Sequence, residues 1–382
     1  MKPGLPVVYL TVFVDLVGFG IILPALPYYA EAFGATGVWI GAILAAYSAA
    51  QLVGASLLGR LSDRVGRRPI LLLSLAGSAA SLVVCGLAGS LWLLLVARAL
   101  AGLFGGSIAA AQAVIADVTA PGERAKYMGL LGASVGLGFV FGPAIGAGLS
   151  RFGFGAAAFA AAGLAALNLV FAFFRLPETR TAEKRVRPHS RFDWSSFADT
   201  LRHPSIGRLL AATFLSTLAF VAMEATFALL GQARFGLDTG RLGLVFTYVG
   251  VVMVIVQGGL VGRLAPRFGE RALATAGALI MAASLGALPF VPSFGIALGV
   301  LAALAVGQGL TTPMLATLLS RATDADEQGG TLGLGQSLAA AARAVGPIGA
   351  GWLYDRAAAA PYAVAAAVMV LAALLVGTVR TE

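Results

Sequence analysis

Long apolar stretches separated by short polar segments run through the whole sequence. Windows of about 20 mainly apolar residues, the length that crosses a bilayer as a helix, occur twelve times. In the first half they begin near Val7, Gly37, Ile70, Leu91, Tyr127 and Gly155. In the second half they begin near Ile206, Leu242, Ala272, Phe294, Thr331 and Pro361. The pattern predicts an all-α membrane protein with twelve transmembrane helices.

The overall composition supports this interpretation. Hydrophobic residues make up 59% of the chain and charged residues 11%, whereas soluble domains carry about 25% charged residues. Fifty glycines and 16 prolines are tolerated in membrane helices, because neighbouring helices satisfy the freed backbone groups. The first apolar stretch is longer than a signal peptide's apolar core and lacks a clear cleavage site, so we expect it to be a span.

The positive charges are distributed unevenly between the polar segments. An even number of spans puts both termini on one side of the membrane. With cytoplasmic termini, twenty Lys and Arg residues lie on the cytoplasmic side and four on the outer side. This bias follows the positive-inside rule and predicts an inner-membrane protein with both termini in the cytoplasm. The net charge of +9 therefore reflects topology, and we expect no nucleic-acid partner.

Few residues could hold a metal or cofactor. A single cysteine, Cys85, excludes an intramolecular disulfide and a thiolate metal cluster. The two histidines, His189 and His203, lie in the most polar segment, where a solvated surface is expected. We therefore expect neither a metal nor a cofactor.

The sequence contains an internal repeat. Residues 59–68 recur at 262–271 with an offset of 203, and Gly142-Pro143 recurs as Gly346-Pro347 with an offset of 204. Two matches at nearly one offset indicate a duplicated six-span unit. The predicted organisation is a six-helix bundle at 1–178, a cytoplasmic linker at 179–203 and a second bundle at 204–382. Two such bundles related by a pseudo-two-fold axis are a common design of secondary transporters.

The strongest motif is the expected loop after the second span, Gly-Arg-Leu-Ser-Asp-Arg-Val-Gly-Arg-Arg-Pro at 59–69. Glycines permit tight turns and close approach, the aspartate can cap a helix or pair with an arginine, and the arginines can bind lipid phosphates. The alternative is an ordinary basic loop that obeys the positive-inside rule. The candidate gating residues are Gly59, Asp63, Arg64, Gly66, Arg67 and Arg68.

This loop resembles the signature of the major facilitator superfamily, G-x-L-[SA]-D-R-x-G-R-[RK]. The resemblance covers essentially the whole chain, including the Leu-Pro-Glu-Thr at 176–179 after the sixth span. It implies that the loop helps to lock the two halves in an outward-facing state, with Asp63 and Arg64 in that latch. The second copy departs from the signature, with Pro266 at the Asp position and Glu270 at an Arg position.

The fifth span is rich in glycine. Gly138, Gly142 and Gly146 lie four residues apart, so they share one helix face that can pack closely. Pro143 weakens the helix locally and allows bending. Tight packing alone is the alternative. The run resembles the motif of drug/proton antiporters within the superfamily, with Ala147 as a departure, and this resemblance implies antiport.

Two acids and two arginines lie inside predicted spans. A carboxylate in hydrocarbon can bind and release a proton near neutral pH, which proton coupling requires; Asp15 and Glu224 are the candidates. Structural hydrogen bonds or pairing with an intramembrane arginine are the alternatives. Arg98 matches the family's R-x-x-x-G motif, whose arginine is implicated in proton transfer, or it is an arginine that snorkels to the interface. Arg343 is either a partner of Glu224 or an anion contact.

A third set of residues is expected to line the substrate cavity. Aromatic and methionine side chains suit hydrophobic substrates of variable shape, although each could equally be packing. The candidates are Phe19, Tyr47, Gln51, Met223, Phe227, Tyr248, Met253 and Gln257.

Within the superfamily the chain is most similar to the tetracycline/proton antiporters and their multidrug relatives. The residues that carry this similarity are Asp15 in Val-Asp-Leu-Val-Gly-Phe-Gly, the loop at 59–69, and Ile115-Ala-Asp117-Val-Thr before Gly122-Glu-Arg124. Met253 stands where those exporters carry a histidine, and Ser81 and apolar residues near Ile280 replace two of their acids. A lipophilic drug, including a cationic one, is therefore expected rather than a tetracycline–metal chelate.

These observations predict a monomeric exporter that exchanges external protons for a hydrophobic small molecule. A metabolite exporter or facilitator that is not driven by proton antiport is the alternative within transport. A membrane receptor or an integral-membrane enzyme is the alternative outside it. Against an enzyme, the spans contain no combination of nucleophile, histidine and carboxylate and no metal-ligand set.

Overall fold

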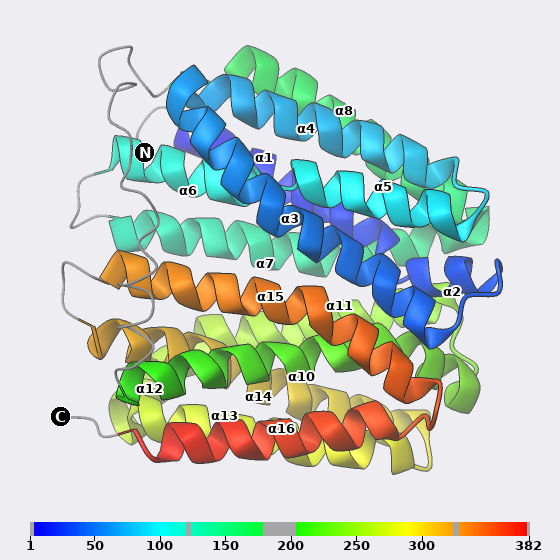
Figure 1. Ribbon diagram of the computed structural model, residues 1–382, viewed down its shortest axis with the longest axis vertical. Coiled ribbons are helices and arrows are strands. Elements are labelled where there is room, and N and C mark those ends of the chain that lie inside the picture. Colours follow the sequence, from blue (N-terminus) through cyan, green and yellow to red (C-terminus); the bar gives the residue numbers. More distant parts are fainter. Residues whose placement is uncertain (1–3, 120–123, 179–203, 324–327, 380–382) are drawn as a thin grey trace. The chain divides into compact units, whose positions relative to one another are not determined.

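The computed structural model describes residues 4–119, 124–178, 204–323 and 328–379, and all regular elements within these ranges are helices (Figure 1). The predicted linker, with His189 and His203, lies outside the described residues. The first elements are α1 (Leu5–Ile22), α2 (Leu26–Glu31), α3 (Gly37–Val65), α4 (Arg67–Gly86), α5 (Leu91–Phe104), α6 (Ser107–Val118), α7 (Arg124–Leu149), η2 (Ser150–Phe152) and α8 (Gly153–Arg175). The later elements are α10 (Pro204–Phe235), α11 (Thr239–Ile255), η4 (Val256–Leu260), α12 (Val261–Phe268), α13 (Glu270–Ala287), η5 (Leu288–Phe290), α14 (Phe294–Arg321), α15 (Gln328–Tyr354) and α16 (Ala360–Gly377).

The apolar pattern located the helices closely. Each of the twelve expected starts falls within three residues of the first residue of a helix. Two expected spans are interrupted. The fourth is divided into α5 and α6 at Gly105 and Gly106, and the eighth contains the π-helical segment η4 between α11 and α12. Periodicity alone does not reveal such local breaks, because the apolar run continues through them.

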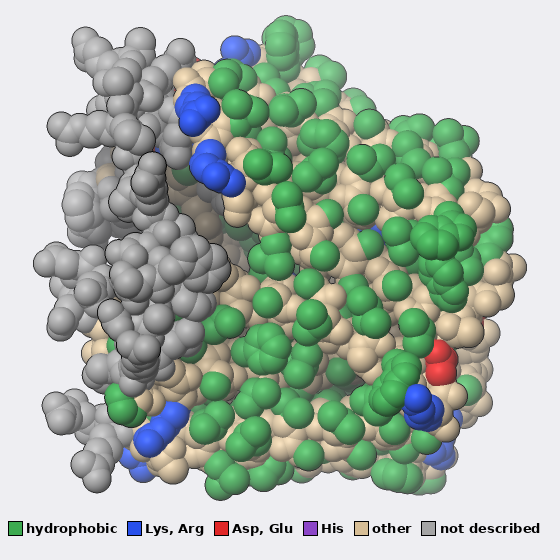
Figure 2. All heavy atoms as spheres, in the orientation of Figure 1, with side chains coloured by type: hydrophobic (Ala, Val, Ile, Leu, Met, Phe, Trp, Pro, Cys, Tyr) green, Lys and Arg blue, Asp and Glu red, His purple; other side chains and the backbone are tan. Residues whose placement is uncertain are grey.

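Length and composition alone identify nine helices in the described residues that could cross a membrane. One of these runs, Tyr127–Arg175, contains most of α7 and all of α8. The surface agrees with a lipid environment: Phe174, Leu167 and Trp92 are 76%, 69% and 67% exposed. Hydrophobic side chains spread over the face shown in Figure 2. So much exposed apolar surface marks a membrane-facing protein.

The chain divides into two compact units with the same internal packing. Unit 1 comprises Met1–Ala35, Ala46–His189 and Leu237–Thr247, and unit 2 comprises Thr36–Ala45, Ser190–Gly236 and Tyr248–Glu382. In unit 1, α1 packs on α7 and α8, and α4 packs on α5 and α8. In unit 2, α10 packs on α15 and α16, and α13 packs on α14 and α16. The repeat found in the sequence is therefore also a repeat of helix pairs.

One end of unit 1 has a well-packed apolar core. Buried side chains from α1, α4, α6, α7 and α8 form it, including Leu5, Leu75 and Ile115, each 0% exposed. Burial of such side chains from water or from the polar interface is favourable by roughly 1.5–3 kcal/mol each. This core fixes the ends of α4, α6 and α8, which carry the charged residues described next.

Candidate functional site

The predicted loop at 59–69 is mostly helical. Residues 59–65 are the end of α3, and the chain turns only at Gly66, whose φ of +123° favours glycine. A Cβ at Gly66 would also collide with the carboxylate of Glu178. The close approach expected at Gly59 is not found, because no heavy atom lies within 4 Å of the position of its Cβ. Gly269, 203 residues after Gly66, makes the equivalent turn with a φ of +80°.

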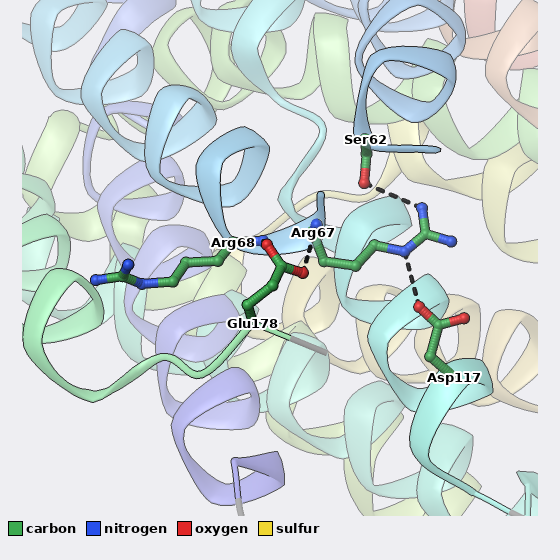
Figure 3. Close-up of polar contacts among 5 residues, drawn as sticks. All are labelled: Ser62, Arg67, Arg68, Asp117 and Glu178. Atoms are coloured by element: carbon green, nitrogen blue, oxygen red, sulfur yellow. Dashed lines mark hydrogen bonds and ion pairs between the residues drawn. The ribbon is translucent and has the colours of Figure 1, made fainter. Parts of the chain in front are cut away.

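Arg67 forms the centre of a polar cluster at this turn (Figure 3). Its Nε lies 2.9 Å from Oδ2 of Asp117 on α6, and its Nη1 donates to Ser62 Oγ on α3 at 3.0 Å. The Arg67 side chain is 10% exposed and that of Asp117 is 29% exposed. The acidic partner described for Arg67 comes from α6, and a pairing of Asp63 with one of the motif's arginines stays a prediction. The side chain of Asp63 lies outside the described part of the molecule.

Glu178, just after α8, caps the beginning of α4. Its carboxylate oxygens accept from the backbone N–H groups of Arg67 at 3.0 Å and Arg68 at 3.2 Å. A carboxylate at a helix N-terminus satisfies free N–H groups and interacts favourably with the helix dipole. Arg68 Nη2 in turn donates to the carbonyl oxygen of Phe173 on α8 at 2.6 Å. Arg64 is exposed at the end of α3, so the motif's arginines occupy three different environments.

Unit 2 contains the corresponding ion pair with its charges reversed. The offset of 203 takes Arg67 to Glu270, and the offset of 204 takes Asp117 to Arg321. Arg321 Nη2 lies 2.8 Å from Glu270 Oε1. Glu270 appeared in the sequence only as a departure from the signature. The structure shows that its charge is matched by a second change at the equivalent of Asp117.

The glycine face of α7 packs against α1. A Cβ at Gly142 would lie 2.6 Å from the Cα of Gly20, and Gly138 and Gly146 contact α1 just as closely. The expected close packing is present, and it joins two helices within unit 1. Pro143 lies inside α7, which continues through it as a helix. Its role as a hinge stays a prediction.

Asp15 is held by two hydroxyl groups. Ser107 Oγ donates to its Oδ2 at 2.6 Å, and Ser78 Oγ donates to its Oδ1 at 3.2 Å. Ser107 is the first residue of α6, directly after the break that separates α5 from α6. The interruption of the fourth span therefore brings a hydrogen-bond donor to the carboxylate. The sequence pattern indicates Asp15 but neither serine, because the serines are 63 and 92 positions away from it in the chain.

Arg98 lies in the middle of α5 and is 2% exposed. Its guanidinium carbon lies 5.1 Å from the ring centroid of Phe19 and 4.6 Å from that of Tyr47. This burial excludes the snorkelling alternative. Gly102 lets Tyr47 approach, since a Cβ there would collide with the Tyr47 carbonyl oxygen. The Gln51 amide donates to the Tyr47 hydroxyl at 3.3 Å, so three expected cavity residues gather near this arginine.

In unit 2, Glu224 on α10 interacts electrostatically with Arg343 on α15. This supports the first of the two roles considered for Arg343. Met223 and Phe227, expected to line a cavity, are 2% and 0% exposed and contribute to the packing of unit 2. The remaining candidates are Tyr248 and Met253 on α11 and Gln257 in η4. In the described ranges no three His, Cys, Asp or Glu residues are grouped as a metal site.

Comparison with known proteins identifies the family. The sequence model described as Major Facilitator Superfamily matches residues 8–304 and 241–382. The chain belongs to this superfamily. The resemblance drawn from the motif at 59–69 is thereby confirmed, and so is the expected all-helical membrane fold of the superfamily. The superfamily consists of transporters, so the chain is a multi-pass membrane transporter and not an enzyme.

Named relatives place it near drug exporters. It is 33% identical to tetracycline resistance protein, class C, of Escherichia coli, over 88% of this chain and 86% of that one. It is 28% identical to multidrug resistance protein 2 of Bacillus subtilis (strain 168), over 90% and 87% of the two chains. The crystal structure of the human organic anion transporter MFSD10 (TETRAN) superposes with a TM-score of 0.73 at 27% identity, covering 98% of each chain.

Proposed function

We propose that this protein is a proton-coupled exporter of lipophilic drugs or similar small molecules that works by alternating access. It acts as a monomer in the inner membrane with both termini in the cytoplasm. The relatives named for tetracycline and multidrug resistance support a drug as substrate. The excess of Lys and Arg in one set of connecting segments supports the orientation.

The observation that carries the proposal is the environment of Asp15. Two neutral hydroxyls contact its carboxylate, at 2.6 Å and 3.2 Å. A hydroxyl can donate to an ionised carboxylate and can also accept from a protonated one, so this site satisfies the acid in both states. Asp117 differs, because its partner is the Arg67 guanidinium, which has hydrogen-bond donors and no acceptor. Asp15 is therefore suited to bind and release a proton, and Asp117 to a constant structural role.

Glu224 supplies a second candidate for proton coupling. Its charge interacts with that of Arg343 on a neighbouring helix of unit 2. Protonation of Glu224 would remove its charge attraction to Arg343. A proton that binds one conformation better than the other shifts the balance between them. In this scheme the two halves at 1–178 and 204–382 alternate between two states, as expected for two parallel repeats.

Drug-induced proton movement in inverted membrane vesicles tests the proposal. Ethidium added to vesicles with an acidic interior is expected to release part of the pH gradient through the wild-type protein. Asp15→Asn is expected to reduce this release by about a hundredfold or more, the loss typical of removing a proton-transfer group. Asp238→Asn is the control, because that exposed side chain caps α11 through the Arg241 N–H group and asparagine retains the cap.

The same vesicles separate the two transport mechanisms. If the wild type moves ethidium without releasing protons, or if Asp15→Asn releases as many as the wild type, proton antiport through Asp15 is wrong. Gradient-independent ethidium flux would then favour the alternative, an exporter or facilitator without proton coupling. A matching assay with Glu224→Gln shows whether one acid or both are required.

A further inference from the structure

The Arg98 guanidinium is a buried charge for which the described residues provide no counter-charge. It is 2% exposed, and its Nε has no hydrogen-bond partner. Neither the ion pair of Arg67 with Asp117 nor that of Arg321 with Glu270 includes Arg98. Removing an arginine from water without a paired anion is costly. Such a charge is expected to be compensated by something that binds to it.

The other deeply buried arginine of unit 1 provides a comparison. Arg67 is 8% exposed. Its guanidinium pairs with a carboxylate at 2.9 Å and donates to a hydroxyl oxygen at 3.0 Å. Both arginines are buried inside unit 1, but only Arg67 has a described carboxylate within ion-pair distance. The aromatic rings near Arg98 offset part of its desolvation through cation–π attraction. They supply no acceptor for its N–H groups.

The surroundings of Arg98 favour a flat, anionic ligand. The rings of Phe19 and Tyr47 lie 4.8 Å apart, tilted by 42°, and the guanidinium faces both. A guanidinium that stacks through its face keeps the donors at its edge, where they match the two oxygens of a carboxylate or sulfonate. The rings can in turn stack on an aromatic body attached to that group.

We propose that Arg98, Phe19 and Tyr47 form a subsite for the anionic group of an aromatic substrate. The subsite rests on the proposed export function and adds to it that the protein also accepts molecules that carry a negative charge beside an apolar ring system. Gly102 and Gln51 build the subsite by letting the Tyr47 backbone approach and by bonding the Tyr47 hydroxyl. Arg98 then acts on the substrate directly and not on the transported proton.

Binding of a matched pair of probes tests this subsite. Purified protein in lipid nanodiscs, without any gradient, is equilibrated with 2-naphthoate and, separately, with 2-naphthamide, which has the same shape without the charge. The wild type is expected to prefer the naphthoate by about tenfold, the size of a charge-assisted hydrogen bond beyond a neutral one. Arg98→Gln is expected to bring the ratio to about one. Arg98→Lys is expected to keep part of the preference, because it retains the charge but not the planar fork.

Arg151→Gln is the control. The guanidinium carbon of Arg151 lies 4.7 Å from the ring centroid of Phe152, but the Arg151 side chain is exposed. It is expected to leave the ratio unchanged. Equal binding of the two probes by the wild type, or no naphthoate binding at millimolar concentration, overturns the subsite. Equal weakening of both probes in Arg98→Gln shows a structural role and also overturns it. If Arg98→Gln does not fold, the ratios of the wild type and Arg98→Lys decide.

The naphthoate-to-naphthamide binding ratio is measured without a proton gradient, so it can be interpreted separately from proton coupling. A ratio that survives Arg98→Gln, together with loss of ethidium-driven proton release in that variant, would place Arg98 in proton coupling and reject the anion subsite. Conversely, a wild type that releases no protons but prefers naphthoate would refute the antiport proposal and leave the subsite standing.

Discussion

The charge-reversed ion pairs of the two units allow a direct test of how burial sets the strength of an ion pair. Exposed pairs contribute about 0–1 kcal/mol, and breaking a buried pair costs about 3–5 kcal/mol. Arg67 and Asp117 are 10% and 29% exposed, between these limits, so we expect a coupling free energy of about 2 kcal/mol. Arg321 is 68% exposed, and its pair with Glu270 should contribute about 0.5 kcal/mol or less.

A double-mutant cycle measures each coupling. The free energy of unfolding in mixed micelles is determined for the wild type, Asp117→Asn, Arg67→Gln and the double variant, and likewise for Glu270→Gln and Arg321→Gln. The coupling energy is the part of the double variant's effect that the single variants do not explain. Coupling is expected to be clearly larger in unit 1 than in unit 2.

Exchanging the charges of the unit 1 pair gives a second result. Arg67→Glu with Asp117→Arg reproduces the polarity that Glu270 and Arg321 already have. It is expected to recover part of the stability lost in Arg67→Glu alone. Recovery stays incomplete, because the new glutamate lies beside the Glu178 carboxylate that caps α4. Equal coupling in both units, or none at Arg67, would refute the argument from burial.

Three further predictions follow from the packing. Gly142→Leu is expected to separate α1 from α7 and to destabilise the protein by about 1–3 kcal/mol in the same unfolding assay. Gly148→Leu should have little effect, because no heavy atom lies within 4 Å of a Cβ at that position. Gly66→Ala is expected to lower the unfolding free energy by about 1–3 kcal/mol because of its positive φ; Gly59→Ala, inside α3, should raise it by up to about 1 kcal/mol. Cys85 is 2% exposed, so a maleimide should label it only after unfolding; rapid labelling of the folded protein would contradict the packing around it.

The sequence by itself determined the positions of the helices and the duplication. The lipid core offers no hydrogen-bond partners, so every backbone N–H and C=O group of a span must be hydrogen-bonded within its own helix. Each span therefore needs a long apolar run, and such runs are read directly from the chain. The repeat needed only self-comparison, and the residues of the signature at 59–69 were sufficient to indicate the family that comparison confirmed.

Which side chains act together was decided by the tertiary structure. Arg67 is 50 positions from Asp117 and 111 from Glu178, and both Ser78 and Ser107 reach Asp15 from other helices. Pairings of this kind depend on how each helix is rotated and where it is interrupted. Apolar patterning in lipid constrains rotation weakly, because outward and inward faces are both hydrophobic. The chemistry-bearing residues were therefore visible in the sequence one at a time, and only packing assigned their partners.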